Sequence, residues 1–184
     1  MRKALLLFLI FTMALLAVAE KAPSADKMIS EARARAKAEQ KTILLIFGAS
    51  WCAGCDVLDS FLKNPQTQAV FDKHFVVVHL NVFEEAGEHP GNNTPGGDKW
   101  IIKFGGVSPA GEVSFPFMVV LDADGKRLID SRRTPDRNSK DTNIGFPSEP
   151  VEVDWFLRML KQGAPNLTDE ESQQISTMLQ QASG

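Results

Sequence analysis

Two cysteines separated by two residues are the feature of this sequence best suited to chemistry. They lie in the segment Trp51-Cys52-Ala53-Gly54-Cys55 and are the only cysteines among the 184 residues. The segment follows an apolar run and opens a helical pattern, so Cys52 lies at a predicted helix N-terminus. Unpaired N–H groups and the helix dipole favour a thiolate there, the species that attacks disulfides. Because residues three apart share a helix face, the two sulfurs can also join. The pair predicts dithiol–disulfide chemistry.

Other uses of two cysteines fit the sequence less well. A structural zinc site needs four ligands at matched spacing, and besides the thiols the chain has only His74, His79 and His89. Attachment of a c-type haem requires histidine directly after the second cysteine, where this chain has Asp56. A purely structural disulfide remains open for an exported chain, although so short a loop contributes little unfolded-state entropy. No metal and no cofactor are expected.

The N-terminal segment has the form of a signal peptide. Arg2 and Lys3 precede the apolar stretch Ala4 to Val18, and Ala17-Val18-Ala19 supplies small residues at a cleavage site. An uncleaved membrane anchor is the alternative, but the apolar run is short for a spanning helix. We expect residues 1–19 to be removed and the rest to be periplasmic or secreted, without membrane association after cleavage.

The remaining chain has the size of one domain and is acidic. Removing nineteen of the 184 residues leaves 165, residues 20–184, which can bury a sizeable core. Loss of Arg2 and Lys3 leaves 18 basic residues against 23 acidic ones, a net charge near −5. A nucleic-acid partner is not expected, because it would require a basic patch. We expect a monomer.

Apolar periodicity and turn residues predict helices and strands in alternation. Thr42–Phe47 is a continuous apolar run, which indicates a central strand covered on both faces. Helical patterns cover residues 25–40, 52–62, 66–73, 100–104, 151–162 and 168 to about 182. Further strands are predicted at 75–82, 117–121 and 127–130, the last two forming a hairpin. Residues 131–150 are polar and predict a long surface loop.

Polar residues mark two of the helix starts. Asn64 precedes Pro65, a cap followed by proline at the first helical position. Thr168 is expected to cap the last helix, with Glu171 as its reciprocal partner.

The loop at residues 83–98 is expected to lie beside the cysteines. The first two strands should run parallel, since a helical crossover joins them. Their C-terminal ends then share one edge of the sheet, where open α/β sheets usually bind ligands. The loop is therefore either a substrate contact or a solvated insertion.

The order of strand, Cys-X-X-Cys helix, strand, helix, hairpin and helix resembles the thioredoxin superfamily. Trp51-Cys52-x-x-Cys55 is similar to the family's active site, and Ser114-Phe115-Pro116-Phe117 is similar to its cis-proline segment. Asn64–Val70 resembles exported members, including bacterial thiol:disulfide interchange proteins. The resemblance implies an α/β fold: a three-layer α/β/α sandwich with a mixed central sheet, a core at about 42–162, and additional N- and C-terminal helices.

The resemblance also implies roles for individual residues. Cys52 would be the nucleophile, ionised and reachable by solvent, and Cys55 the resolving thiol. Pro116 would face them, and a cis bond there would present the neighbouring carbonyl to an extended substrate strand; a trans proline would be an ordinary strand start. Phe115 would flank the substrate and Trp51 would shield the thiols, unless either aromatic is plain packing.

Departures from the family bear on the direction of the reaction. Ile46 stands where many thioredoxins have a buried carboxylate that assists proton transfer from the resolving cysteine. His79 stands at the site of a buried lysine, and its imidazole either accepts a proton at neutral pH or is simply hydrogen-bonded. Asp56 follows Cys55 and opposes the thiolate, and a higher thiol pKa makes a better reductant.

We therefore predict an exported thiol:disulfide oxidoreductase that reduces protein disulfides and exchanges electrons with an unidentified upstream redox partner. An enzyme that oxidises or isomerises client thiols is the nearest alternative. A non-catalytic module that binds peptides on a thioredoxin scaffold, with a structural disulfide, is a second one.

Overall fold

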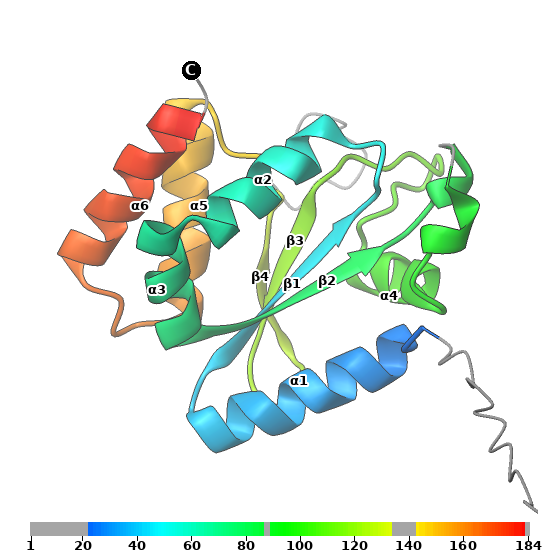
Figure 1. The fold of residues 1–184 in the computed structure, drawn as a ribbon, viewed down its shortest axis with the longest axis horizontal. Helices are drawn as coiled ribbons and strands as arrows, with labels where there is room; N and C mark the ends of the chain where they lie inside the picture. The colour runs from blue at the N-terminus through cyan, green and yellow to red at the C-terminus, as the bar shows by residue number, and fades with distance from the viewer. Residues whose placement is uncertain (1–21, 87–88, 134–142, 183–184) are drawn as a thin grey trace, which may run out of the picture.

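A four-stranded sheet with helices on both faces forms the centre of the molecule (Figure 1). The computed structural model describes residues 22–86, 89–133 and 143–182. The strands are β1 (Thr42–Gly48), β2 (Phe75–Asn81), β3 (Phe117–Leu121) and β4 (Arg127–Asp130). The helices are α1 (Ala25–Glu39), α2 (Ala53–Lys63), α3 (Pro65–His74), α4 (Gly97–Phe104), α5 (Pro150–Gly163) and α6 (Asp169–Ala182). Two short 3-10 turns, η1 (Glu84–Ala86) and η2 (Pro90–Asn92), follow β2.

The sheet has the order β2-β1-β3-β4 and is mixed. β1 pairs with β2 in parallel and with β3 antiparallel, and β3 and β4 form an antiparallel hairpin. The parallel pair follows from the α2–α3 crossover, since parallel neighbours need a long connection. The predicted central strand, mixed sheet and hairpin are confirmed.

Alternation along β1 separates two cores. Leu44 and Ile46 face the layer of α2, α3, α5 and α6, whereas Ile43, Leu45 and Phe47 face α1 and α4. All five side chains are buried, as a strand covered on both faces requires. The helices lie on the two sides of the sheet accordingly (Figure 1), which confirms the three-layer sandwich.

Both predicted helix starts are confirmed. Asn64 accepts a hydrogen bond from the backbone N–H of Gln66 at 3.0 Å, and Pro65 is the first residue of α3. Thr168 and Glu171 form the reciprocal pair before α6: the Thr168 N–H donates to Glu171 Oε2 at 2.9 Å, and the Glu171 N–H donates to Thr168 Oγ1 at 3.1 Å.

Two segments differ from the sequence-based prediction. α4 begins at Gly97 rather than at Trp100, because its first turn lacks apolar side chains and packs through a glycine instead. A Cβ at Gly97 would lie 2.8 Å from Val82 Cγ1. Residues 131–150 are not simply a surface loop, since Ser131 and Ile144 are buried. Positions 134–142 lie outside the described residues.

The predicted signal peptide, residues 1–19, also lies outside the described residues. Within them, no helix is both long enough and apolar enough to cross a membrane.

Candidate active site

Cys52 and Cys55 form a disulfide at the N-terminus of α2, with their Cα atoms 5.2 Å apart. Cys52 is the N-cap residue, and the backbone N–H of Cys55 points at its Sγ at a distance of 3.1 Å. This N–H also donates to the Cys52 carbonyl oxygen at 2.9 Å, so it is shared between that carbonyl and the sulfur. As a donor at the helix N-terminus it can stabilise a Cys52 thiolate after reduction. Gly48, at the end of β1, leaves room for the other sulfur: a Cβ there would lie 3.0 Å from Cys55 Sγ.

The two cysteines differ in exposure. Cys52 is 6% exposed, whereas Cys55 is half-buried. The sequence predicts that Cys52 is reachable by solvent, and in the disulfide form the residue keeps a small exposed fraction. The Cys52 residue therefore offers little surface to an attacking thiol in the disulfide form, although an exchange reaction must reach its sulfur.

Pro116 lies against the loop between the cysteines. The Phe115–Pro116 peptide bond is cis. A Cβ at Gly54 would lie 3.5 Å from Pro116 Cδ and 4.0 Å from the Phe115 carbonyl oxygen. The Cys-X-X-Cys loop and the proline segment are therefore neighbours at van der Waals distance.

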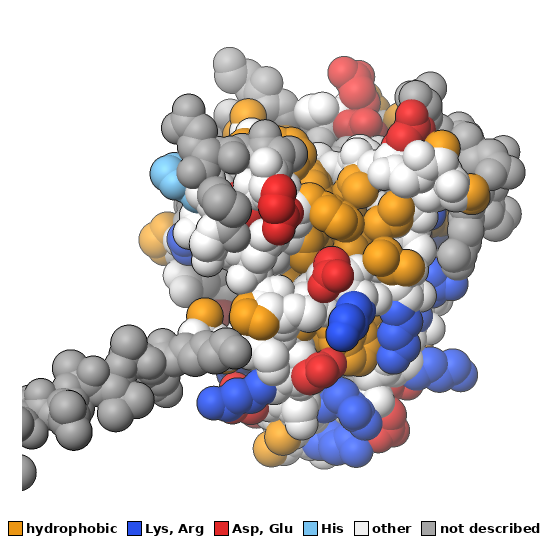
Figure 2. Space-filling view, turned by 90° about the vertical axis from the view of Figure 1, so that its right-hand side faces the viewer, with side chains coloured by type: hydrophobic (Ala, Val, Ile, Leu, Met, Phe, Trp, Pro, Cys, Tyr) orange, Lys and Arg blue, Asp and Glu red, His pale blue; other side chains and the backbone are white. Residues whose placement is uncertain are grey.

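Aromatic side chains form an apolar surface next to this loop. The Trp51 ring is T-shaped to Phe115, with centroids 5.7 Å apart, and its Nε1 donates to the Phe83 carbonyl at 3.2 Å. Trp51 remains 47% exposed. The face on the α4 side of the molecule carries a cluster of hydrophobic side chains bordered by acidic and basic ones (Figure 2). Trp51 and Phe115 thus lie in contact next to the cysteine loop. The predicted roles, Phe115 flanking the substrate and Trp51 shielding the thiols, stay predictions.

Glu84 holds the turn that leads into the cysteines. Its side chain is fully buried, and its two carboxylate oxygens accept from the Ser50 N–H at 2.8 Å and the Ser50 hydroxyl at 2.6 Å. The Glu84 N–H in turn donates to Asn93 Oδ1 at 3.2 Å. The loop at 83–98 is therefore fastened to the cysteine turn. Sequence reasoning missed Glu84, because a glutamate in a polar loop gives no local sign of a partner 34 residues away.

A cavity of about 250 Å³ opens beside Cys55, between α2 and the ends of β1 and β2. Ile46, Asp59 and His79 are among its lining residues, and Ile46 and His79 are register partners on neighbouring strands. The His79 residue is exposed at the surface, yet desolvation by the surrounding protein lowers the pKa of its imidazole. The negative charge of Asp59 acts in the opposite direction and raises that pKa. The imidazole is therefore neutral at neutral pH and can accept a proton.

Asn143 fixes the proline segment from behind. Its amide nitrogen donates to the carbonyl oxygens of Ser114 at 2.9 Å and Pro116 at 3.0 Å. Its amide oxygen accepts from the Ser131 hydroxyl at 2.5 Å, and that hydroxyl oxygen accepts from the Met118 N–H at 2.9 Å. Sequence reasoning missed Asn143 because it falls in a stretch whose composition predicts a solvated loop.

The histidines are not gathered around the thiols. In the parts of the chain that the structure describes, no group of three or more His, Cys, Asp or Glu side chains is placed to hold a metal ion. His74 contacts Glu171 of α6 instead, with its Nε2 3.0 Å from the carboxylate. His79 is the histidine that shares a cavity with a cysteine.

Residues 25–123 match the family model described as thioredoxin-like, which is more than half of the 184 residues. The chain belongs to the thioredoxin-like family. A solved structure described as a disulphide isomerase from Xylella fastidiosa Temecula1 is 25% identical to it, with a TM-score of 0.51, and the match covers 79% of this chain and 98% of that chain.

Two further solved structures are less similar to this thioredoxin-like chain. One, described as DsbH oxidoreductase, has 20% identity and a TM-score of 0.43, covering 62% of this chain and 74% of its own. The other, the C-terminal domain of DsbD from Neisseria meningitidis in the oxidised form, has 17% identity and a TM-score of 0.40. The match covers 59% of this chain and 83% of that chain. No curated protein matches the sequence significantly.

The family match and the geometry together give the general activity. This thioredoxin-like chain combines the family fold with a Cys52-X-X-Cys55 disulfide at a helix N-terminus. It is a thiol–disulfide oxidoreductase, which confirms the enzyme class that the sequence predicts.

Proposed function

We propose that this chain is an exported enzyme that reduces protein disulfides with the Cys52–Cys55 dithiol. The observation that carries the proposal is the placement of Cys52 as the N-cap of α2, with the Cys55 N–H directed at its Sγ. A helix N-terminus favours the thiolate, and the thiolate is the nucleophile of disulfide exchange.

Cys52 performs the first step. Its thiolate attacks one sulfur of a client disulfide, a bond forms between Cys52 Sγ and that sulfur, and the other client sulfur leaves as a thiolate that takes a proton from water. The Cys55 N–H, 3.1 Å from Cys52 Sγ, stabilises the attacking sulfur before the reaction.

Cys55 performs the second step. It gives its proton to a base and attacks Cys52 Sγ, which releases the second client sulfur as a thiolate and closes the Cys52–Cys55 disulfide. Two electrons have then moved from the enzyme to the client. His79 is the proposed proton acceptor, since it shares the Cys55 cavity and is neutral at neutral pH because its pKa is lowered. An upstream donor of two electrons must return the disulfide to the dithiol.

The client is proposed to lie along the proline segment. Pro116 and the Phe115 carbonyl lie against Gly54 of the cysteine loop, so an extended strand here would pass next to the sulfurs. Trp51 and Phe115, whose rings are in contact, would cover its apolar side chains. The partners are therefore disulfide-bonded proteins, and the chain acts as a monomer.

Reduction is the favoured direction. Asp56, exposed and directly after Cys55, adds negative charge beside the sulfurs and disfavours thiolates, which makes the dithiol a better reductant. Isomerisation is the second candidate, favoured by the similarity to the structure described as a disulphide isomerase. An isomerase uses the same attack by Cys52, but the client's own thiol resolves the mixed disulfide.

Export is proposed for the same chain. Arg2, Lys3, the apolar stretch 4–18 and the small residues at 17–19 form a signal peptide that leaves residues 20–184 as the mature domain. A periplasmic or secreted location follows, where a client with disulfides is available. N-terminal sequencing of the exported protein tests this: a start at residue 20 supports it, and retention of residues 1–19 contradicts it.

The activity is tested with Cys52→Ser and Cys55→Ser variants and a disulfide-bonded protein. Both variants should lose turnover, and Cys55→Ser should accumulate a mixed disulfide through Cys52 because the resolving thiol is missing. Full turnover in both variants would contradict the proposal. Equilibration of the wild type with glutathione tests the direction, since a strongly oxidising pair would exclude a reductase.

A further inference from the structure

We infer that Glu84 is a positioning residue that sets the redox equilibrium of the cysteine pair. Its buried carboxylate holds the Ser50 turn in place, and its negative charge shifts the dithiol–disulfide equilibrium of the cysteine pair toward the disulfide. The inference rests on the proposed function, because it concerns the same two sulfurs.

The geometry is that of a clamp on one residue. Both oxygens of Glu84 are used by Ser50, Oε1 by the backbone N–H at 2.8 Å and Oε2 by the hydroxyl at 2.6 Å. Acceptance by both oxygens is the pattern of an ionised carboxylate. Ser50 is two residues before Cys52, and the Cys52 N–H donates to the Ala49 carbonyl at 3.1 Å, so the clamped turn continues directly into the N-cap of α2.

The charge of Glu84 is not neutralised by a cation. None of the Lys, Arg or His side chains in the described residues forms an ion pair with it, and it is 0% exposed to solvent. Its donors are a backbone amide and a hydroxyl. A buried negative charge with uncharged donors keeps most of its field, because water does not screen it.

The charge lies close enough to act on Cys52. Consecutive Cα atoms are about 3.8 Å apart, so the backbones of residues 50 and 52 are within about 7 Å and Glu84 within about 10 Å of Cys52. At that distance, and at the effective dielectric constant of protein sites, one charge changes the pKa of a thiol by about one unit. The sign is fixed: a carboxylate disfavours the thiolate, and this favours the disulfide.

The test uses variants that separate charge from geometry. Glu84→Gln keeps an oxygen that accepts from the Ser50 N–H but removes the charge. Ser50→Ala keeps the charge and removes one hydrogen bond. Glu85→Gln is the matched control, because Glu85 is the exposed neighbour in η1. Each full-length mature protein is equilibrated with glutathione, and the pKa of the Cys52 thiol is measured by alkylation rate against pH.

We expect Glu84→Gln to lower the pKa of the Cys52 thiol by about one unit. The equilibrium with glutathione should shift about tenfold toward the dithiol, which corresponds to about 30 mV in reduction potential. Glu85→Gln should change neither, and Ser50→Ala should not lower the pKa. Equal values for Glu84→Gln and Glu85→Gln would overturn the inference while exchange by the wild type still supported the proposed function.

A measurement on the wild type covers the case in which Glu84→Gln does not fold. The clamp predicts that the Ser50 amide exchanges its hydrogen slowly, although the Ser50 residue itself is exposed. Exchange as fast as in an unfolded chain would show that the clamp does not exist and would overturn the inference. A wild type without disulfide exchange would instead contradict the proposed function, whatever the Ser50 amide does.

Discussion

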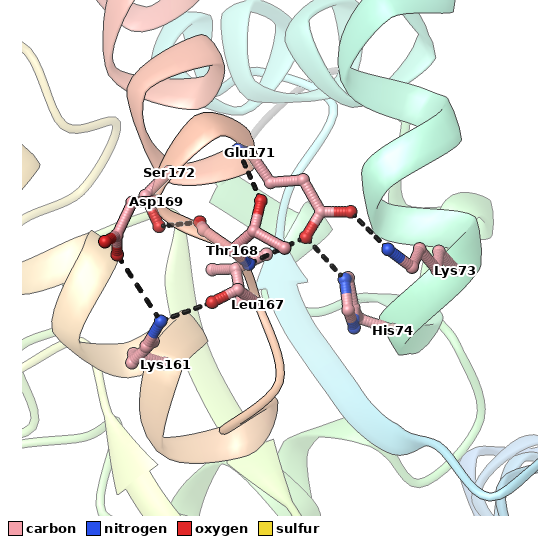
Figure 3. A network of polar contacts seen from close by, with 8 residues as sticks. All are labelled: Lys73, His74, Lys161, Leu167, Thr168, Asp169, Glu171 and Ser172. Atoms are coloured by element: carbon pink, nitrogen blue, oxygen red, sulfur yellow. Dashed lines mark hydrogen bonds and ion pairs between the residues drawn. The ribbon is translucent and has the colours of Figure 1, made fainter.

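Two glutamates at opposite ends of the parallel β1–β2 pair are kept from water in different ways. Glu84, at the C-terminal end, meets the uncharged donors of Ser50. Glu171, at the N-terminal end, meets a cation, Lys73 Nζ at 2.7 Å, together with His74 Nε2 at 3.0 Å and the Thr168 N–H (Figure 3). A carboxylate paired with a cation is stabilised as an ion. The negative charge of a carboxylate that meets only neutral donors is not compensated, so it acts on the neighbouring groups.

The Glu171 network therefore serves stability. Burial acts to raise the pKa of Glu171, but the hydrogen bonds from Lys73, the Thr168 N–H and His74 lower it to about 2. The network joins the start of α6 to the end of α3 (Figure 3), and the side chain of His74 is 2% exposed. The comparison suggests a division between the two ends of the β1–β2 pair. The N-terminal end, with Glu171, stabilises the fold, and the C-terminal end, with Glu84, sets the redox equilibrium of the thiols.

Glu171→Ala is the strongest test of that division. It removes the partner of a buried histidine and the side chain that pairs with the Thr168 cap of α6, so we expect the free energy of unfolding to fall by about 2–3 kcal/mol. The redox equilibrium with glutathione should stay at the wild-type value. Denaturant unfolding measures the first quantity, and Glu170→Ala, at an exposed neighbouring position, is the control. A shift of the redox equilibrium in Glu171→Ala would break the division.

Acid titration tests the same network without a truncation. The pKa of Glu171 is lowered from 4.5 to about 2 in the folded state. Its stabilising contribution is therefore present above about 4.5 and is lost as the pH falls from 4.5 towards 2. Glu171→Gln should be less stable than the wild type at neutral pH, with the difference shrinking through this range. A difference independent of pH would show that the charge is not responsible.

Asn143→Ala tests whether the end of the sheet near the cysteines positions a client. It removes two hydrogen bonds to the carbonyls of Ser114 and Pro116, the segment proposed to align a client strand. We expect the KM for a disulfide-bonded peptide to rise several-fold, while the reaction with glutathione disulfide, which needs no such strand, changes little. Equal losses with both substrates would indicate a general structural defect instead.

His79→Asn is expected to have the smallest effect. The resolving step should slow a few-fold at pH 7, because a neutral imidazole no longer takes the proton of Cys55. The wild type should lose this advantage as the pH falls below 6.5 towards the lowered pKa of His79. Stopped-flow decay of the mixed disulfide measures it, and identical pH profiles for the two proteins would exclude the role.

Local signals in the sequence predicted the cysteine pair and the helix starts, but not the side chains that hold the site in place from distant loops. The cysteine pair, Asn64 before Pro65, and Thr168 with Glu171 are short-range patterns, and each was found where the sequence predicted it. Glu84 and Asn143 act on partners 34 and 27 to 29 residues away, in loops whose composition looks solvated. Contacts of that range depend on how the sheet edge brings loops together, which residue spacing does not encode.

The exposure of Cys52 was also beyond the sequence. Spacing placed it correctly at the helix N-terminus, but its surroundings come from segments that meet only in the fold. The resulting 6% exposure makes the reactivity of this sulfur the central question.

Competitive alkylation of the reduced protein at pH 7, with the modified cysteine identified by mass spectrometry, answers that question most directly. Our account predicts that Cys52 is modified before Cys55 and faster than the same cysteine in the urea-unfolded chain, because the helix N-terminus stabilises its thiolate. Modification of Cys55 first, or of Cys52 no faster than in the unfolded chain, would contradict it.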